Sequence, residues 1–177
     1  MPFSRELYIE REDFLVDPPK KFFRLGPGLM ARLKGAYIVK VEDFTLNEDG
    51  SVKEVFASYI PESKSGSDTS GINVKGTMHW VSIPHAKTAE VRLFDRLLIV
   101  ENAGDLGDDF IKFINPESLQ TLEKVYIEPA LANVEVGKGL QFIRKGYFCK
   151  DSDSTENQLI FNRTVTLKDT WAKAQNK

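Results

Sequence analysis

The feature that most constrains this chain is an alternation of apolar and polar residues with a period of two, interrupted at short intervals by turn residues. Side chains on a β-strand point alternately to opposite faces, so the pattern predicts strands with one buried face. Leu7 and Ile9 begin it, alternating with Glu6, Tyr8 and Glu10. The chain carries neither a long amphipathic helical pattern nor a repeat of about 20 to 50 residues. We therefore predict an all-β barrel or sandwich.

The clearest predicted hairpin joins residues 32–47 to residues 52–60 through Asp49-Gly50, a pair that supplies the positive φ of a tight turn. Residues 62–71 are so rich in Ser, Gly and charged residues that we expect a mobile loop that does not pack. The remaining predicted elements are strands at 74–83, 89–100, 119–128, 140–149 and 158–167, a turn at 104–107, and a short helix beginning at Asp108-Asp109.

Positive charge is concentrated in two stretches, although the formal net charge of the chain is −2. Residues 18–40 contain six basic residues and no acid, and residues 136–150 contain four basic residues and no acid. Glycine-containing turns lie beside both stretches, which predicts that both lie at barrel rims. A positively charged face for nucleic acid can therefore exist on an acidic protein. The alternative is that these Lys and Arg residues form ordinary solvated surface.

Catalytic chemistry finds little support in the sequence. Neither a phosphate-binding glycine loop nor a Gly-x-Ser-x-Gly elbow is present. Asp108-Asp109 is best interpreted as a helix cap, Cys149 as a buried inert thiol, and His79 and His85 as sheet residues. We therefore expect no catalytic residue, metal or cofactor in this chain. The single cysteine and the lack of a signal peptide or membrane-spanning apolar segment favour a cytoplasmic location.

The residues that remain are suited to recognition of nucleic acid. Arginine can donate two hydrogen bonds to a guanine edge or a phosphate, and glutamine offers both a donor and an acceptor. In a regular strand Gln141 and Arg144 would face opposite sides, so their use on one ligand requires a bulge or a strand end. Four aromatic residues could either stack on unpaired bases or pack in the core: Phe22, Phe23, Tyr37 and Tyr147.

Several contiguous motifs run in order along essentially the whole chain: residues 2–14, Arg24-Leu25, 32–37, 74–82, 90–97, Phe142 with 146–149, and 161–171. Together these motifs resemble the anticodon-binding region of glutaminyl-tRNA synthetases. The resemblance implies two antiparallel β-barrels with a short helix. The proximal barrel would comprise residues 1–22 and 101–177, and the distal barrel residues 23–100.

The resemblance also implies roles for individual residues in gripping the anticodon of glutamine tRNA. Arg24 matches the arginine that reads the third base, a guanine, and Arg32 matches the one that reads the first base. Lys34 replaces a second arginine near the first base, and it offers a point charge without a planar fork. Gln141 and Arg144 match the pair that holds the central uracil. Phe23 departs from the family pattern because it replaces a basic residue beside Arg24.

Synthetases of this family bind ATP and glutamine in a catalytic core upstream of this region, and the motifs of that core are absent from this sequence. We therefore expect a fragment whose partners are glutamine tRNA and the parent catalytic domain, without a membrane. Such a fragment is expected to be a monomer, and an edge-strand dimer would be a consequence of truncation. Two alternatives stay open at this stage: the anticodon-binding region of a glutamyl-tRNA synthetase, and a stand-alone barrel of the ribosomal 5S-binding type.

Overall fold

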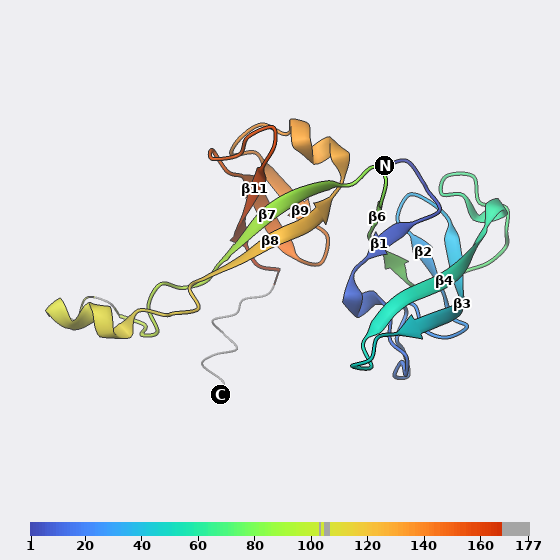
Figure 1. The fold of residues 1–177 in the computed structure, drawn as a ribbon, viewed down its shortest axis with the longest axis horizontal. Helices are drawn as coiled ribbons and strands as arrows, with labels where there is room; N and C mark the ends of the chain where they lie inside the picture. The colour runs from blue at the N-terminus through green and yellow to red at the C-terminus, as the bar shows by residue number, and fades with distance from the viewer. Residues whose placement is uncertain (103, 105–106, 168–177) are drawn as a thin grey trace. The chain divides into compact units, whose positions relative to one another are not determined.

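The regular elements of the chain are β-strands and short 3-10 turns, in a computed structural model that describes residues 1–102, 104 and 107–167. The described residues contain no α-helix, which confirms the all-β class. The chain divides into two compact units, Met1–His85 and Ala86–Lys177, whose strands are labelled in Figure 1. Most strand pairs are antiparallel, but the β2–β5 and β7–β11 pairs are parallel. Closure of the sheets into barrels stays a prediction.

The first unit contains a two-stranded and a four-stranded sheet. β1 (Leu7–Ile9) pairs with β6 (Trp80–Ser82). The four-stranded sheet has the order β4-β3-β2-β5. Its strands are β2 (Met30–Leu33), β3 (Ile38–Leu46), β4 (Val52–Ile60) and β5 (Thr77–Met78). Residues from both sheets fill one core, which includes Ala31, Leu33, Val39, Val41, Met78 and, from β6, Trp80.

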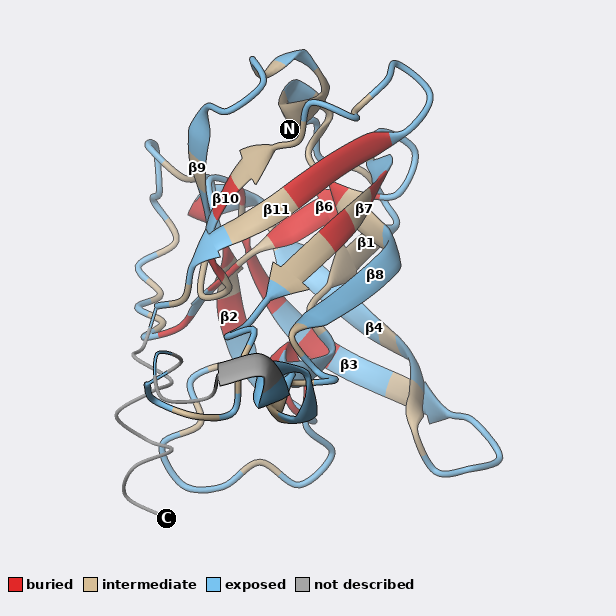
Figure 2. Cartoon of the chain, turned by 90° about the vertical axis from the view of Figure 1, so that its left-hand side faces the viewer, coloured by how far each residue is buried: buried red, intermediate tan, exposed pale blue. Residues whose placement is uncertain are grey.

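The second unit is built on one five-stranded sheet of order β8-β7-β11-β10-β9. Its strands are β7 (Lys87–Phe94), β8 (Leu119–Ile127), β9 (Gly139–Phe142), β10 (Gly146–Lys150) and β11 (Leu159–Val165). Burial is concentrated on β11 and on parts of β7 and β10, whereas β8 is mostly exposed (Figure 2). Phe148 and Phe161 are almost completely buried in this core.

Short 3-10 turns connect several strands. They are η1 (Arg11–Asp13), η2 (Pro61–Ser63), η4 (Gly107–Phe113) and η5 (Pro129–Asn133). The helix predicted from Asp108-Asp109 is therefore present as the 3-10 segment η4, which lies on the long connection between β7 and β8 (Figure 1). The predicted turn at 104–107 falls partly outside the described residues. Residues 168–171, the end of the family motif, lie entirely outside them.

Most predicted strands are present, but three that were predicted as single segments are divided, and the strand predicted at 89–100 ends at Phe94. Residues 74–83 form the short strands β5 and β6, which belong to different sheets. Residues 32–47 contain a turn between β2 and β3, and residues 140–149 contain a turn between β9 and β10. The predicted hairpin of β3 and β4 is confirmed, with Gly50 at φ 80°. Residues 62–71 form a loop, but the expectation that this loop would not pack is wrong because Ser63 is completely buried. Its hydroxyl accepts the backbone N–H of Ile38 at 2.7 Å.

The two compact units are divided at 85/86, and the predicted proximal barrel (residues 1–22 and 101–177) and distal barrel (residues 23–100) stay predictions. The pairing of β1 with β6 ties residues 7–9 to residues 80–82 within the first unit. The pairing of β7 with β11 ties residues 89–93 to the second unit. These long-range pairings leave no local mark in the sequence, and they place the break between the two compact units at 85/86.

Candidate nucleic-acid interface

The segment that carries Arg24 and the strand that carries Arg32 meet at one glycine of the first unit. The carbonyl oxygen of Gly76 accepts the backbone N–H of Arg32 at 2.9 Å. A Cβ atom on Gly76 would lie 1.6 Å from the carbonyl oxygen of Phe23. Only a residue without a side chain allows this approach. Gly76 thus lies where the Arg24 segment and the Arg32 strand meet, and sequence reasoning did not single it out as part of the site.

Arg24 is fixed by a buried carboxylate. Its Nε lies 3.1 Å from Oδ1 of Asp13, whose side chain is completely buried, while about a third of the Arg24 side chain stays exposed. A terminal nitrogen of Arg24 also donates to the carbonyl oxygen of Glu12 at 3.3 Å. The guanidinium lies 5.8 Å from the centre of the Phe22 ring. The contacts restrict a long side chain while leaving part of it available to a ligand.

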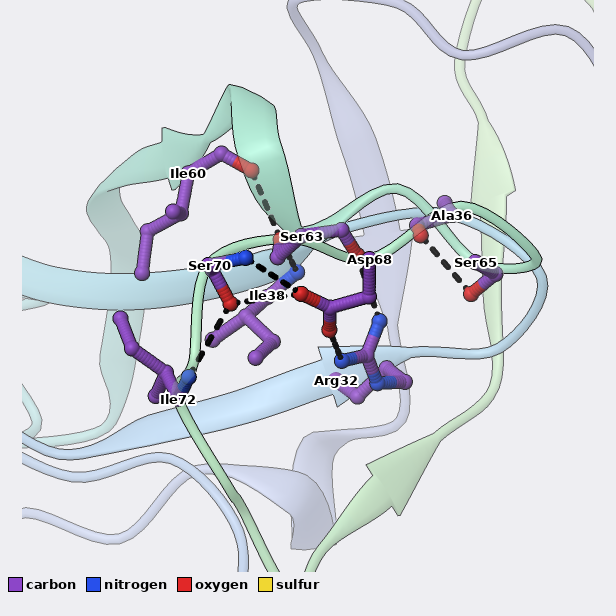
Figure 3. A network of polar contacts seen from close by, with 9 residues as sticks. All are labelled: Arg32, Ala36, Ile38, Ile60, Ser63, Ser65, Asp68, Ser70 and Ile72. Atoms are coloured by element: carbon purple, nitrogen blue, oxygen red, sulfur yellow. Dashed lines mark hydrogen bonds and ion pairs between the residues drawn. The ribbon is translucent and has the colours of Figure 1, made fainter.

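Arg32 is held by the loop that follows β4 (Figure 3). Because Ala31 and Leu33 face the first core, Arg32 points to the opposite face of the sheet, where this loop lies. Its guanidinium donates to the carbonyl oxygen of Ser63 at 2.6 Å and forms an ion pair with Asp68. The Asp68 carboxylate in turn accepts the backbone N–H and the hydroxyl of Ser70. These hydrogen bonds and Arg32 lower the pKa of Asp68, with the Ser70 hydroxyl as the largest cause.

Lys34 lies on a tight turn between β2 and β3 with its side chain exposed. Gly35 at φ 69° makes this turn. Two hydrogen bonds fix the backbone of Lys34. Its N–H donates to the carbonyl oxygen of Met78, and its carbonyl oxygen accepts the Nε1–H of Trp80. A single positive charge is therefore presented to solvent from a fixed backbone.

Lys75 brings a positive charge next to Phe23, the residue that replaces a basic residue of the family pattern. Its ammonium lies 5.1 Å from the centre of the Phe23 ring, a cation–π contact, and Phe23 is 47% exposed. Tyr37, by contrast, packs against Phe3 and Tyr59 at ring distances of 5.1 and 5.2 Å. Phe23 thus stays accessible for stacking, and Tyr37 belongs to an aromatic cluster.

In the second unit, Gln141 and Tyr147 form an exposed pair across the β9–β10 hairpin. Phe142 and Phe148 stack at 4.3 Å in the core, so their strand neighbours Gln141 and Tyr147 face the opposite side of the sheet. Tyr147 is 45% exposed. An amide and an aromatic ring therefore lie side by side on one open face.

Arg144 lies in the turn of this hairpin rather than in a strand. β9 ends at Phe142, and the N–H of Lys145 donates to the carbonyl oxygen of Phe142 at 2.9 Å. Arg144 has φ 64°, a conformation that favours glycine. The strand end required for Gln141 and Arg144 to serve one ligand is present. An arginine in a costly backbone conformation points to a functional demand on its side chain.

One arginine near these strands, Arg92, is engaged by carboxylates and is not a candidate for contact with nucleic acid. Arg92 on β7 lies 2.7 Å from Glu90 and within 3.7 Å of carboxylate oxygens of Asp151 and Asp153. Glu90 is the main reason that the pKa of Arg92 is raised. The pKa of Asp151 is lowered, chiefly by the backbone N–H of Asp153 and by Asn162. This network neutralises the charge of Arg92 and favours a structural role for it.

Among residues 1–102, 104 and 107–167, no group of three or more His, Cys, Asp or Glu side chains is placed so that it could hold a metal ion. None of the helices among those residues has the length and apolar character to cross a membrane.

Comparison with known proteins defines the class of this chain. Residues 1–60 and residues 77–151 match two family models, both described as the anticodon-binding domain of class I tRNA synthetases for E and Q. The chain therefore belongs to the anticodon-binding domains of the class I tRNA synthetases.

Its relatives carry a more particular name. The chain is 51% identical over its whole length to a protein of Rhodopirellula baltica named glutamine--tRNA ligase. It is 48% identical over its whole length to the glutamine--tRNA ligase of Vibrio campbellii, and 47% identical over 97% of its length to that of Nitrobacter hamburgensis. It spans 30%, 32% and 30% of the length of these three relatives.

Proposed function

We propose that this chain recognises the anticodon of glutamine tRNA as part of a glutamine--tRNA ligase. The observation that carries the proposal is the match of the whole chain to glutamine--tRNA ligases at up to 51% identity. The parent enzyme would attach glutamine to this tRNA with ATP, in a catalytic domain outside this chain.

The proposed site uses five side chains, and the resemblance assigns one anticodon position to each. In the first unit, Arg24 reads the third base, and Arg32 with Lys34 contacts the first. In the second unit, Gln141 and Arg144 hold the central uracil. The observed contacts support these roles, because Arg24 and Arg32 are pre-oriented and Arg144 lies in the turn of a hairpin. A side chain fixed before binding loses less conformational entropy when the RNA arrives.

Discrimination would come from buried polar groups that a wrong base leaves unpaired. Each base contact of this kind is worth roughly 1 to 3 kcal/mol. Exposed lysines such as Lys20, Lys21 and Lys138 would contact phosphates and supply the salt-dependent part of the affinity.

The glutamine assignment has one close competitor. The matching family models cover both glutamate and glutamine enzymes, so a glutamyl-tRNA synthetase would match them too. The names of the relatives favour glutamine, and the match to these models disfavours a stand-alone barrel of the ribosomal 5S-binding type.

The test uses a glutamine-tRNA anticodon stem-loop and the same RNA with its central base changed. We expect Arg144→Ala to weaken binding of the first RNA by about 1 to 3 kcal/mol and to affect the second much less. Lys138→Ala is the matched control, because loss of a phosphate contact should weaken both RNAs equally. Equal losses for both RNAs in Arg144→Ala would contradict a base-reading role.

A further inference from the structure

The loop of residues 61–71 is built as a frame around Arg32. The completely buried Ser63 accepts the N–H of Ile38 and donates to the carbonyl oxygen of Ile60, both at 2.7 Å. Further along, Ser65 donates to the carbonyl oxygen of Ala36 from both its backbone N–H and its hydroxyl. The loop is thus attached to β3, β4 and the β2–β3 turn by hydrogen bonds.

Asp68 is itself fixed before it meets Arg32. One carboxylate oxygen accepts the Ser70 backbone N–H at 2.8 Å and the Ser70 hydroxyl at 2.7 Å. The Ser70 hydroxyl also accepts the N–H of Ile72 at 3.2 Å. The second carboxylate oxygen of Asp68 contacts Arg32 (Figure 3). The carboxylate therefore has a defined position that does not depend on the arginine alone.

Two of the five N–H groups of the Arg32 guanidinium are used by Ser63 and Asp68, one from each terminal nitrogen. The Nε–H and one N–H on each terminal nitrogen are left over, which is enough for a two-pronged contact to a base edge. The Arg32 side chain also keeps 22% of its surface exposed. The contacts with the loop restrict the guanidinium without using up its donors.

We propose that Asp68 is a positioning residue that orients Arg32 for recognition of the first anticodon base. The inference rests on the proposed function, and it adds a residue from a loop 36 positions away from Arg32 in the sequence. Without the carboxylate, Arg32 would keep only its hydrogen bond to the Ser63 carbonyl oxygen, and part of the binding free energy would be spent on ordering its side chain.

A matched control lies at the β3–β4 turn. Asp49 sits in the same Asp-x-Ser arrangement, where its carboxylate accepts the Ser51 backbone N–H at 2.8 Å as Asp68 accepts that of Ser70. Asn keeps the acceptor oxygen for this turn and removes the charge. Asp68→Asn and Asp49→Asn therefore change the same kind of turn, and only the first removes an ion pair with Arg32.

The experiment measures binding of the chain to a glutamine-tRNA anticodon stem-loop and to RNAs with the first or the central anticodon base replaced. We expect Asp68→Asn to reduce discrimination at the first base about fivefold to tenfold, with discrimination at the central base unchanged. Asp49→Asn should change neither ratio. In an Arg32→Ala background, Asp68→Asn should have no further effect, whereas a merely structural role would still lower affinity there. Thermal melting checks that each variant is folded.

Other results overturn the inference in distinguishable ways. Unchanged or tighter binding by Asp68→Asn, together with lost discrimination in Arg32→Ala, would mean that Asp68 does not position Arg32 or competes with the RNA for it. In that case the proposed function survives. Unchanged first-base discrimination in Arg32→Ala would remove the base-reading role of Arg32, and the positioning role of Asp68 would fall with it.

Discussion

In the first unit, Arg24 and Arg32 are each held by a carboxylate from another segment, whereas in the second unit Gln141 and Arg144 are positioned within one hairpin. The first arrangement is electrostatic and depends on tertiary contacts. In the second arrangement Arg144 has φ 64°, so the conformation of the turn contributes to its orientation. Two compact all-β units of one chain thus orient candidate base-reading groups by different physical means.

This difference indicates which substitutions should disturb the candidate residues of each unit. The arginines of the first unit should lose their orientation when a distant residue changes, because their partners come from η1 and from the loop after β4. The hairpin of the second unit should respond chiefly to changes inside the turn. The following predictions test this contrast, from the largest expected effect to the smallest.

Gly76→Ala should have the largest effect. The new Cβ would meet the Phe23 carbonyl oxygen, which is backbone and cannot move aside cheaply. We expect a loss of at least about 3 kcal/mol in the free energy of unfolding of the first unit. Urea unfolding followed by Trp80 fluorescence in a Trp171→Phe background measures it, because Trp80 lies in the core of that unit.

Gly139→Ala in β9 is the control for this prediction. A Cβ at Gly139 would meet no atom within 4 Å outside its two chain neighbours, so differential scanning calorimetry of the whole chain should show an effect below about 1 kcal/mol. Similar stabilities for the Gly76→Ala and wild-type chains would show that the Arg24 segment does not depend on this close approach.

Asp13→Ala should have the second-largest effect on stability. It leaves the guanidinium of Arg24 without its buried partner, and we expect a loss of about 2 kcal/mol in the free energy of unfolding, discounted because Arg24 is partly exposed. Asp17→Ala, at an exposed position of the same segment, is the control. Equal effects of the two substitutions, measured by urea unfolding, would argue against electrostatic positioning of Arg24.

Arg144→Gly should separate stability from recognition in the second unit. Glycine adopts φ 64° without the penalty paid by arginine, so we expect a gain of about 0.5 to 1 kcal/mol in stability together with loss of central-base discrimination. Lys145→Gly, the next residue, should instead cost about 0.5 kcal/mol. Differential scanning calorimetry and RNA binding test the two effects. A destabilised Arg144→Gly chain would contradict conformational positioning.

The smallest expected effect is the pH dependence of the Asp68 contact. The Ser70 hydroxyl, the Ser70 N–H and Arg32 lower the pKa of Asp68 in the folded state. A carboxyl group with a lowered folded-state pKa stabilises the fold above its unfolded pKa, about 3.9 for Asp. This contribution is lost as the pH falls through the folded-state pKa.

The difference in stability between wild type and Asp68→Asn should therefore be present near neutral pH and shrink below about pH 4. Urea unfolding at a series of pH values measures it. The effect of Lys145→Gly, which concerns backbone conformation, should stay constant over the same range. A constant difference for Asp68→Asn as well would show that its charge does not contribute.

The sequence by itself determined the all-β class and most strand positions, because strand alternation and turn chemistry are local. The Asp49-Gly50 hairpin and the strand end required between Gln141 and Arg144 are examples. The family motifs, which also lie in short contiguous segments, led to the anticodon-binding class that the comparisons bear out. The roles of Arg24, Arg32, Lys34, Gln141 and Arg144 stay predictions.

Only the tertiary structure decided which distant residues meet. Residues 62–71 have the composition of an unpacked loop, yet Ser63 is buried and Asp68 pairs with Arg32. The acid-free stretch around Arg24 acquires an acidic partner, Asp13, from a neighbouring segment. The division at 85/86 follows from strand pairings between residues far apart in the chain. Composition and periodicity record what each segment prefers, and contacts across long separations depend on how all segments pack at once.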